Sequence, residues 1–144
     1  MPVTVEIRGS IGHVVIDNPP VNAVSAAVRQ GLLHAVKTLD ADGNVKGVIL
    51  SCAGKTFIAG ADVSEFDKPA IEPHLPDVIA AIENSRAPWI AAIHGNALGG
   101  GLEIALGCRF RVADKGASLG LPETNLGIIP GSGGTVRTQR LVGV

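Results

Sequence analysis

Apolar residues recur at two different spacings along the N-terminal half, and each spacing predicts one kind of element. Apolar and polar residues alternate in residues 3–8 and 12–17, on either side of a glycine–serine turn, which indicates a β-hairpin. In residues 25–39 the apolar side chains recur every three or four positions, which predicts a helix capped by Ser25. Compact apolar runs at 46–51 and 89–94 predict two buried strands.

Shorter elements follow, separated by glycine- and proline-containing loops. We expect a loop over 53–61 and a mobile surface connection over 68–76, which contains three prolines. The remaining predicted elements are helical segments at 62–66, 77–85, from the glycines at 99–101 to 106, and from 135 onward, with strands at 110–113 and 117–121. Strand, glycine loop and helix alternate, so the predicted fold class is α/β, in one domain over residues 1–144.

Composition makes the chain unusually apolar for its size. Of its 144 residues 46% are hydrophobic and 17% charged, and the mean hydropathy is +0.34. We therefore expect either association through apolar faces into a homo-oligomer or the absence of part of the natural fold. The 12 basic and 13 acidic residues are spread evenly, so neither nucleic acid nor an anionic membrane surface is an expected partner.

No stretch of the sequence is typical of a membrane span or a signal peptide. The longest candidate, residues 87–102, contains His94, Asn96 and four glycines, so we interpret it as core and expect no membrane insertion. Cys52 and Cys108 lie in apolar runs and are too few for a disulfide framework. We expect reduced thiols and a cytoplasmic location.

Candidate chemistry lies where a glycine-bearing loop leads into a helix. Residues 49–62, 90–103 and 128–135 share the order buried strand, glycine loop and helix start. Such a loop presents unpaired N–H groups to an anion or oxyanion, although close backbone packing alone also explains the glycines. Two carboxylates beside these loops, Glu103 and Glu123, favour chemistry, because paired carboxylates can move protons.

Other kinds of site are weakly supported. The sequence lacks both the dinucleotide-binding glycine fingerprint and the phosphate-binding loop with its lysine. The four histidines have no ligand spacing, so no metal is expected, and Ser132 does not lie in a nucleophile elbow. The simplest interpretation of Asp62 is an acid that complements a helix dipole, and His94 reads as a satisfied residue at a strand end.

Four motifs together resemble the enoyl-CoA hydratase/isomerase (crotonase) family, in order and over nearly the whole chain. They are Asn-Pro-Pro-Val-Asn-Ala-Val-Ser at 18–25, Phe-Ile-Ala-Gly-Ala-Asp at 57–62, His-Gly-Asn-Ala-Leu-Gly-Gly-Gly-Leu-Glu at 94–103, and Leu-Pro-Glu at 121–123 with Gly-Ile-Ile-Pro-Gly at 127–131. The first motif is most similar to the N-terminal part of multifunctional fatty-acid oxidation enzymes. The fold that the resemblance implies is a spiral of ββα units.

The resemblance implies a role for each matching position. The oxyanion-hole N–H groups fall on Ala61 and Gly100, and the catalytic glutamates on Glu103 and Glu123, which are 20 positions apart as in hydratases. Glu103 would activate water and Glu123 would protonate the α-carbon. From the residues alone these two roles are interchangeable. Residues that would line the path of coenzyme A are Ala59, Gly60, Asp62, Val63 and Gly99.

The implied activity is hydration of the 2,3 double bond of an enoyl-CoA thioester in fatty-acid β-oxidation. Coenzyme A belongs to the substrate, so no separate cofactor is implied. One alternative is a Δ3,Δ2-enoyl-CoA isomerase. The other is a truncated fold that binds acyl-CoA or self-associates without turnover. Family domains are longer than residues 1–144, so we expect a partial domain without the C-terminal helices that cover the acyl pocket and form the trimer.

Overall fold

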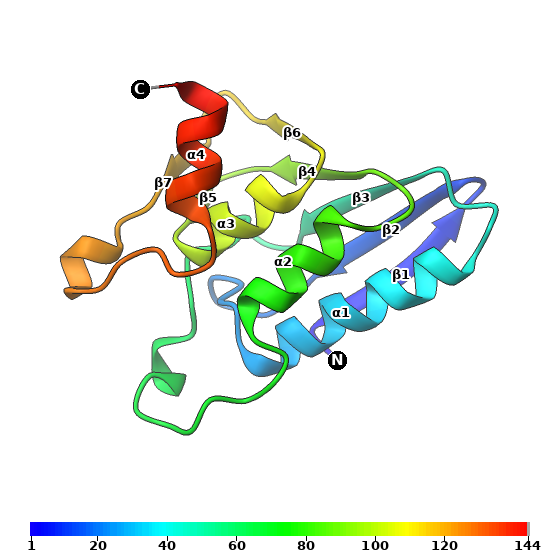
Figure 1. Ribbon diagram of the computed structural model, residues 1–144. Coiled ribbons are helices and arrows are strands. Elements are labelled where there is room, and N and C mark those ends of the chain that lie inside the picture. Colours follow the sequence, from blue (N-terminus) through cyan, green and yellow to red (C-terminus); the bar gives the residue numbers. More distant parts are fainter. Residues whose placement is uncertain (144) are drawn as a thin grey trace.

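Five of the six predicted strands assemble into one five-stranded sheet in the computed structural model, which describes residues 1–143 (Figure 1). Its strand order is β1-β2-β3-β4-β6. The predicted hairpin is confirmed, because β1 (Val3–Arg8) and β2 (Ile11–Ile16) pair antiparallel. The parallel part of the sheet continues through β3 (Gly47–Cys52), β4 (Trp89–Ile93) and β6 (Phe110–Ala113).

Three helices, α1 (Ala26–Ala41), α2 (Leu75–Glu83) and α3 (Gly100–Gly107), lie side by side across one face of this sheet (Figure 1). The predicted cap of α1 is confirmed, because the Ser25 hydroxyl accepts a hydrogen bond from the Val28 N–H at 3.4 Å. The buried stripe of α1 is Val28, Leu32, Ala35, Val36 and Leu39. Burying each large aliphatic side chain stabilises the fold by about 1.5–3 kcal/mol.

The sheet is covered on one face only. Val14 and Ile16 point into the core, whereas His13 and Val15, which alternate with them along β2, are partly exposed. The runs at 46–51 and 89–94 do form strands, but alternate residues within them are likewise only partly buried. The prediction of buried strands therefore holds for one face of β3 and of β4, the face that packs under the helices.

The connection before α2 is shorter than the sequence indicates and is anchored to α1. α2 begins at Leu75 because Pro76 occupies the first turn, where a missing N–H costs nothing. The Arg29 guanidinium donates to the carbonyls of Ile71 and Pro73 at 3.0 and 2.8 Å. Two side-chain hydrogen bonds thus hold a segment that proline content alone marks as mobile.

Two elements near the glycine loops differ from the sequence-based expectation. Residues 96–98 form a strand, β5 (Asn96–Leu98), which pairs with β7 (Ser118–Gly120) in a second, two-stranded sheet. The run at 128–129 is not a buried strand, because Ile128 and Ile129 are 43% and 77% exposed. It lies between a short 3-10 helix, η2 (Glu123–Leu126), and α4 (Gly134–Val142).

Exposed apolar side chains concentrate in the last third of the chain. They include Phe110, Val112, Leu119, Leu126, Ile129, Val136, Leu141 and Val142. The expected association and the expected partial domain both stay predictions. Within residues 1–143, no helix has the length and apolar character needed to cross a membrane. Both cysteines are buried free thiols, and burial raises the pKa of Cys108 to about 12.

Candidate active site

Two loops that are far apart in the sequence meet at a pair of glycines. The segment before Gly60 runs beside β5, where Ile58 donates to the Asn96 carbonyl at 3.0 Å and accepts from the Leu98 N–H at 2.9 Å. Gly60 and Gly99 have φ values of +117° and +53°, which L side chains rarely adopt. A Cβ on Gly99 would lie 3.8 Å from the Gly60 Cα, at van der Waals distance, so the two loops lie against each other.

This contact brings together the N–H groups of the two following residues, Ala61 and Gly100. The Gly100 N–H opens α3, and nothing in residues 1–143 accepts a hydrogen bond from it or from the Ala61 N–H. Gly100 is buried, and a buried backbone N–H without a partner is rare in folded proteins. The two groups are therefore donors available to a ligand.

The Glu123 carboxylate lies over the same turn. A Cβ on Gly99 would come within 3.1 Å of the Glu123 Oε1 atom. The other oxygen, Oε2, is buried and has no hydrogen-bond partner among the described residues. A buried carboxylate oxygen left unpaired is costly, and such atoms often mark a functional position.

These groups border one small cavity of about 120 Å³. Its lining includes seven of the nine residues singled out from the sequence, namely Ala59, Gly60, Ala61, Val63, Gly99, Gly100 and Glu123. Phe66, Leu98 and Leu126 supply apolar walls that the sequence analysis did not identify. Phe66 and Leu126 lie outside the four motifs and Leu98 lies within one without a role of its own, because any apolar side chain of suitable size can line a pocket.

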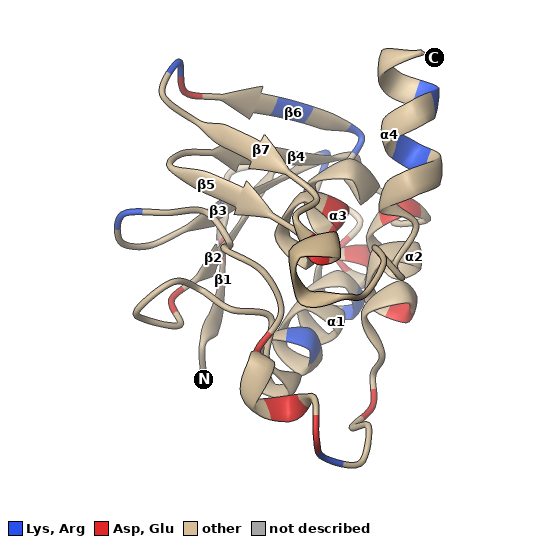
Figure 2. Cartoon of the chain, turned by 90° about the vertical axis from the view of Figure 1, so that its left-hand side faces the viewer, with Lys and Arg blue, Asp and Glu red and all other residues tan. Residues whose placement is uncertain are grey.

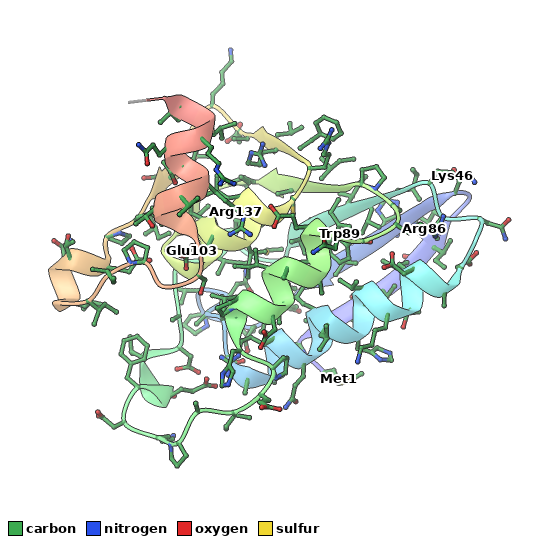
Figure 3. All side chains as sticks on the ribbon, viewed as in Figure 1. Met1, Lys46, Arg86, Trp89, Glu103 and Arg137 are labelled. Atoms are coloured by element: carbon green, nitrogen blue, oxygen red, sulfur yellow. The ribbon has the colours of Figure 1, made fainter. Side chains whose placement is uncertain are left out.

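Glu103 lies outside that lining, between α3 and the start of α4 (Figure 3). It is only 3% exposed, and its Oε1 atom accepts hydrogen bonds from the N–H groups of Ser132 and Gly134 at 2.8 and 2.9 Å. No hydrogen bond to Oε2 is found within residues 1–143. The third glycine loop therefore binds the chain's own carboxylate through these N–H groups and does not present them to an external anion.

Asp62 lies next to the cavity, in the lining of a second pocket of about 270 Å³ that shares Ala61 and Phe66 with the first. The Asp62 carboxylate accepts from the Ser64 N–H at 3.0 Å and caps the 3-10 turn η1 (Val63–Glu65). Hydrogen bonds from Ser64 lower the pKa of Asp62 below its ordinary value. The cationic side chains of Arg29 and Lys68 also border this pocket.

Charged groups elsewhere form no comparable site. Lys and Arg positions are scattered over the molecule and form no continuous stripe (Figure 2). In the described part of the chain, no group of three or more His, Cys, Asp and Glu side chains has an arrangement that could hold a metal ion. His94 Nε2 lies 3.1 Å from the Gly54 carbonyl oxygen, as a satisfied strand-end histidine would.

Known proteins share both the sequence and the fold. Residues 6–144 match the sequence profile of the family described as enoyl-CoA hydratase/isomerase. The probable enoyl-CoA hydratase of Bacillus subtilis (strain 168) is 44% identical over 89% of this chain and 52% of its own length. The peroxisomal fatty acid beta-oxidation multifunctional protein of Oryza sativa subsp. japonica is 43% identical over 99% of this chain and 21% of its own length.

A solved structure gives the same picture in three dimensions. The crystal structure of enoyl-CoA hydratase from Bacillus anthracis superposes with a TM-score of 0.92 and 37% identity. It is matched by 100% of this chain, which covers 59% of the crystallised chain. The chain thus spans about half of the hydratase-named relatives and about a fifth of the multifunctional one.

Proposed function

This chain belongs to the enoyl-CoA hydratase/isomerase family, and we propose that it hydrates the 2,3 double bond of an enoyl-CoA thioester. One observation carries the proposal. Two unpaired N–H groups, of Ala61 and Gly100, border the same cavity as the Glu123 carboxylate, whose Oε2 atom is buried without a partner. Hydratase-named relatives at about 40% identity support the same activity.

In this proposal the thioester oxygen binds between the two N–H groups. Negative charge develops on that oxygen when a nucleophile attacks C3, and donors fixed in advance stabilise it without reorganisation. Removing one such donor typically costs about 3–4 kcal/mol of transition-state stabilisation. Because the backbone supplies both donors, the side chains at Ala61 and Gly100 need only be small.

The two glutamates would then move the protons. The water oxygen bonds to C3 while one water proton passes to Glu103, and the π electron pair moves through C2 to the thioester oxygen. Protonated Glu123 gives its proton to C2 as the carbonyl re-forms, so one water has been added. Proton exchange with solvent restores both carboxyl groups. Glu103 would act through Oε2, because Oε1 already accepts two hydrogen bonds.

Coenzyme A would extend from the cavity across Ala61 into the second pocket. That pocket adjoins the first at Ala61 and Phe66 and contains Lys68, whose charge suits a phosphate of coenzyme A, whereas Arg29 is already paired with Glu65 at 2.9 Å. The small residues Ala59 and Gly60 leave room for the pantetheine arm. We propose fatty-acid β-oxidation as the context, since the rice relative carries that name.

An isomerase is the second candidate, and the position of Glu103 favours it. Only Glu123 lines the cavity, whereas Glu103 is buried behind it with one oxygen occupied. Moving a proton between C4 and C2 of a 3-enoyl-CoA requires a single carboxylate, whereas hydration requires a water molecule held by a second one.

Two substrates separate these activities. We expect the enoyl-thioester absorbance of crotonyl-CoA to fall when folded protein is added. Appearance of that absorbance from a 3-enoyl-CoA, with no loss from crotonyl-CoA, would assign an isomerase instead. Binding of both thioesters without any absorbance change would leave a chain that binds acyl-CoA and does not turn it over, and would contradict the proposed function.

A further inference from the structure

The turn that holds Glu103 is itself held by an arginine. Arg137, on the first turns of α4, donates from Nη1 to the Ser132 carbonyl at 3.3 Å. The N–H of the same residue, Ser132, donates to the Glu103 Oε1 atom at 2.8 Å. Figure 3 shows Glu103 and Arg137 close to the start of α4, on neighbouring elements. Arg137 therefore fixes one of the two groups that orient the Glu103 carboxylate.

Arg137 is anchored in turn to a third element. Its Nε and Nη2 atoms donate to both carboxylate oxygens of Glu83, the last residue of α2, at 3.1 and 2.7 Å. This parallel pair of hydrogen bonds uses the planar fork that only arginine presents. The guanidinium also packs directly on Gly133, where a Cβ would collide with Nη1. One side chain thus joins α2, the glycine turn and α4.

We propose that Arg137 is a positioning residue for Glu103. It connects residues 132–134 to α2 through its bonds to Ser132 and Glu83. The turn then binds the Oε1 atom of Glu103 in one fixed orientation, and the Oε2 atom of Glu103 is left as the oxygen that can take a proton. The catalytic part of this inference rests on the proposed hydration. The competing explanation is a surface ion pair, which would contribute at most about 1 kcal/mol to stability and nothing to catalysis.

The first test separates kcat from KM. We expect Arg137→Gln to lower kcat for crotonyl-CoA by about 10- to 100-fold per folded molecule, because small misplacements of a reacting group have effects of that size. KM should change less than about twofold, since Glu103 does not line the cavity. Arg137→Lys, which keeps the charge but not the fork, should recover part of the loss.

Arg140→Gln is the matched control. Arg140 lies on α4, and its side chain makes no hydrogen bond or ion pair with another residue in 1–143, so its replacement should leave kcat unchanged. An equal loss in Arg140→Gln, or a full kcat in Arg137→Gln, would overturn the positioning role. If Arg137→Gln does not fold, Glu83→Ala keeps the guanidinium and removes both of the acceptors that anchor it. It should then show the same loss in kcat, and an unchanged kcat would overturn the proposal.

The second test does not depend on activity. Hydrogen exchange followed by NMR reports how firmly the Ser132 and Gly134 N–H groups are bound to Glu103. We expect both to exchange at least about tenfold faster in Arg137→Gln than in the wild type, and at the wild-type rate in Arg140→Gln. If the wild type hydrates nothing, the proposed function fails and this measurement alone decides. Unchanged protection in Arg137→Gln would show that Arg137 does not hold the turn.

Discussion

Two glycine turns in this chain look alike in sequence and are used in opposite ways. The first, residues 99–101, opens α3, and its Gly100 N–H has no acceptor in the described structure. The second, residues 131–134, opens α4, and its Ser132 and Gly134 N–H groups are bound by Glu103. One turn is open to a ligand and the other is closed by a side chain of the same protein.

The difference shows that a glycine-rich helix start is only potentially an anion site. Its N–H groups and the helix dipole attract any negative group within reach. At residues 131–134 the buried Glu103 carboxylate of the same chain already accepts hydrogen bonds from the turn. Glu103 is a residue of α3, the helix that follows the open turn, and its carboxylate binds the N–H groups of the closed turn. The two turns are therefore linked through Glu103. This link is the feature that the following predictions test.

Removing the carboxylate at the open turn should have the largest effect. We expect Glu123→Gln to lower kcat by about 10²- to 10⁴-fold, because the amide cannot donate the proton required at C2. The affinity for acyl-CoA should remain within a few-fold, since the two backbone donors are untouched. Steady-state kinetics with crotonyl-CoA and direct binding of butyryl-CoA measure the two quantities. A large loss of affinity with normal turnover would give Glu123 a binding role instead.

Blocking the open turn by a single methyl group should rank second. Gly99→Ala places a Cβ 3.1 Å from the Glu123 Oε1 atom at a φ of +53°, so we expect about a 100-fold lower kcat. Gly127→Ala is the matched control, because Gly127 has a φ of +70° and nothing within 4 Å of its Cβ position. Gly127→Ala, in the left-handed αL conformation, should cost about 1–2 kcal/mol of unfolding free energy, and Gly99→Ala should cost more, because the ψ of −125° at Gly99 lies outside that region. Equal loss of turnover in the two variants would mean that strain alone matters.

Much of the fold was predictable because local patterns agree with it. The period of two at residues 12–17 and the period near 3.6 after Ser25 correspond to β2 and α1. The strand β5 was not predictable, because both of its hydrogen-bonding partners are far away in the sequence: β7, some twenty residues later, and Ile58, some forty residues earlier. Local sequence likewise says nothing about the exposure of Ile129, which depends on what covers it.

The site was predictable in its parts but not in its connections. The motifs identified Ala61, Gly100 and Glu123, which the fold places around one cavity, although their chemical roles remain proposals. Nothing local indicates that Glu103 would bond to Ser132, because the partners are 29 positions apart. The same holds for Arg137 and Glu83, which meet only when α4 packs near α2.

Removing the carboxylate that closes the second turn should lower the free energy of unfolding. We expect Glu103→Leu to lower the unfolding free energy by about 2–4 kcal/mol, because it leaves two N–H groups of the turn without an acceptor. Glu103→Gln keeps an acceptor oxygen and should cost less than about 1 kcal/mol. Urea unfolding of the three proteins measures the difference. If leucine and glutamine are equally tolerated, water satisfies the turn and Glu103 does not close it.

Lowering the pH should weaken the hydrogen bonds that hold the closed turn, and this is the smallest of the expected effects. The hydrogen bond from Arg137 lowers the pKa of Glu83 below its ordinary value of 4.5. The ion pair therefore adds stability that is complete above pH 4.5 and is lost as the pH falls through the lowered value. Hydrogen exchange of the Ser132 and Gly134 amides between pH 6 and pH 3, corrected for intrinsic rates, should show this loss. This pH-dependent loss of protection should be absent in Glu83→Gln. If it persists in that variant, another titrating group causes it.

The most direct test of the open and closed turns is a titration with butyryl-CoA, a thioester that cannot be hydrated, followed through the backbone amide signals. If the thioester oxygen binds as proposed, the Ala61 and Gly100 amide protons should move downfield as they gain an acceptor, while those of Ser132 and Gly134 should not move. Unchanged Ala61 and Gly100 signals at saturating ligand, or shifts confined to Ser132 and Gly134, would contradict the assignment of the open turn as the oxyanion site.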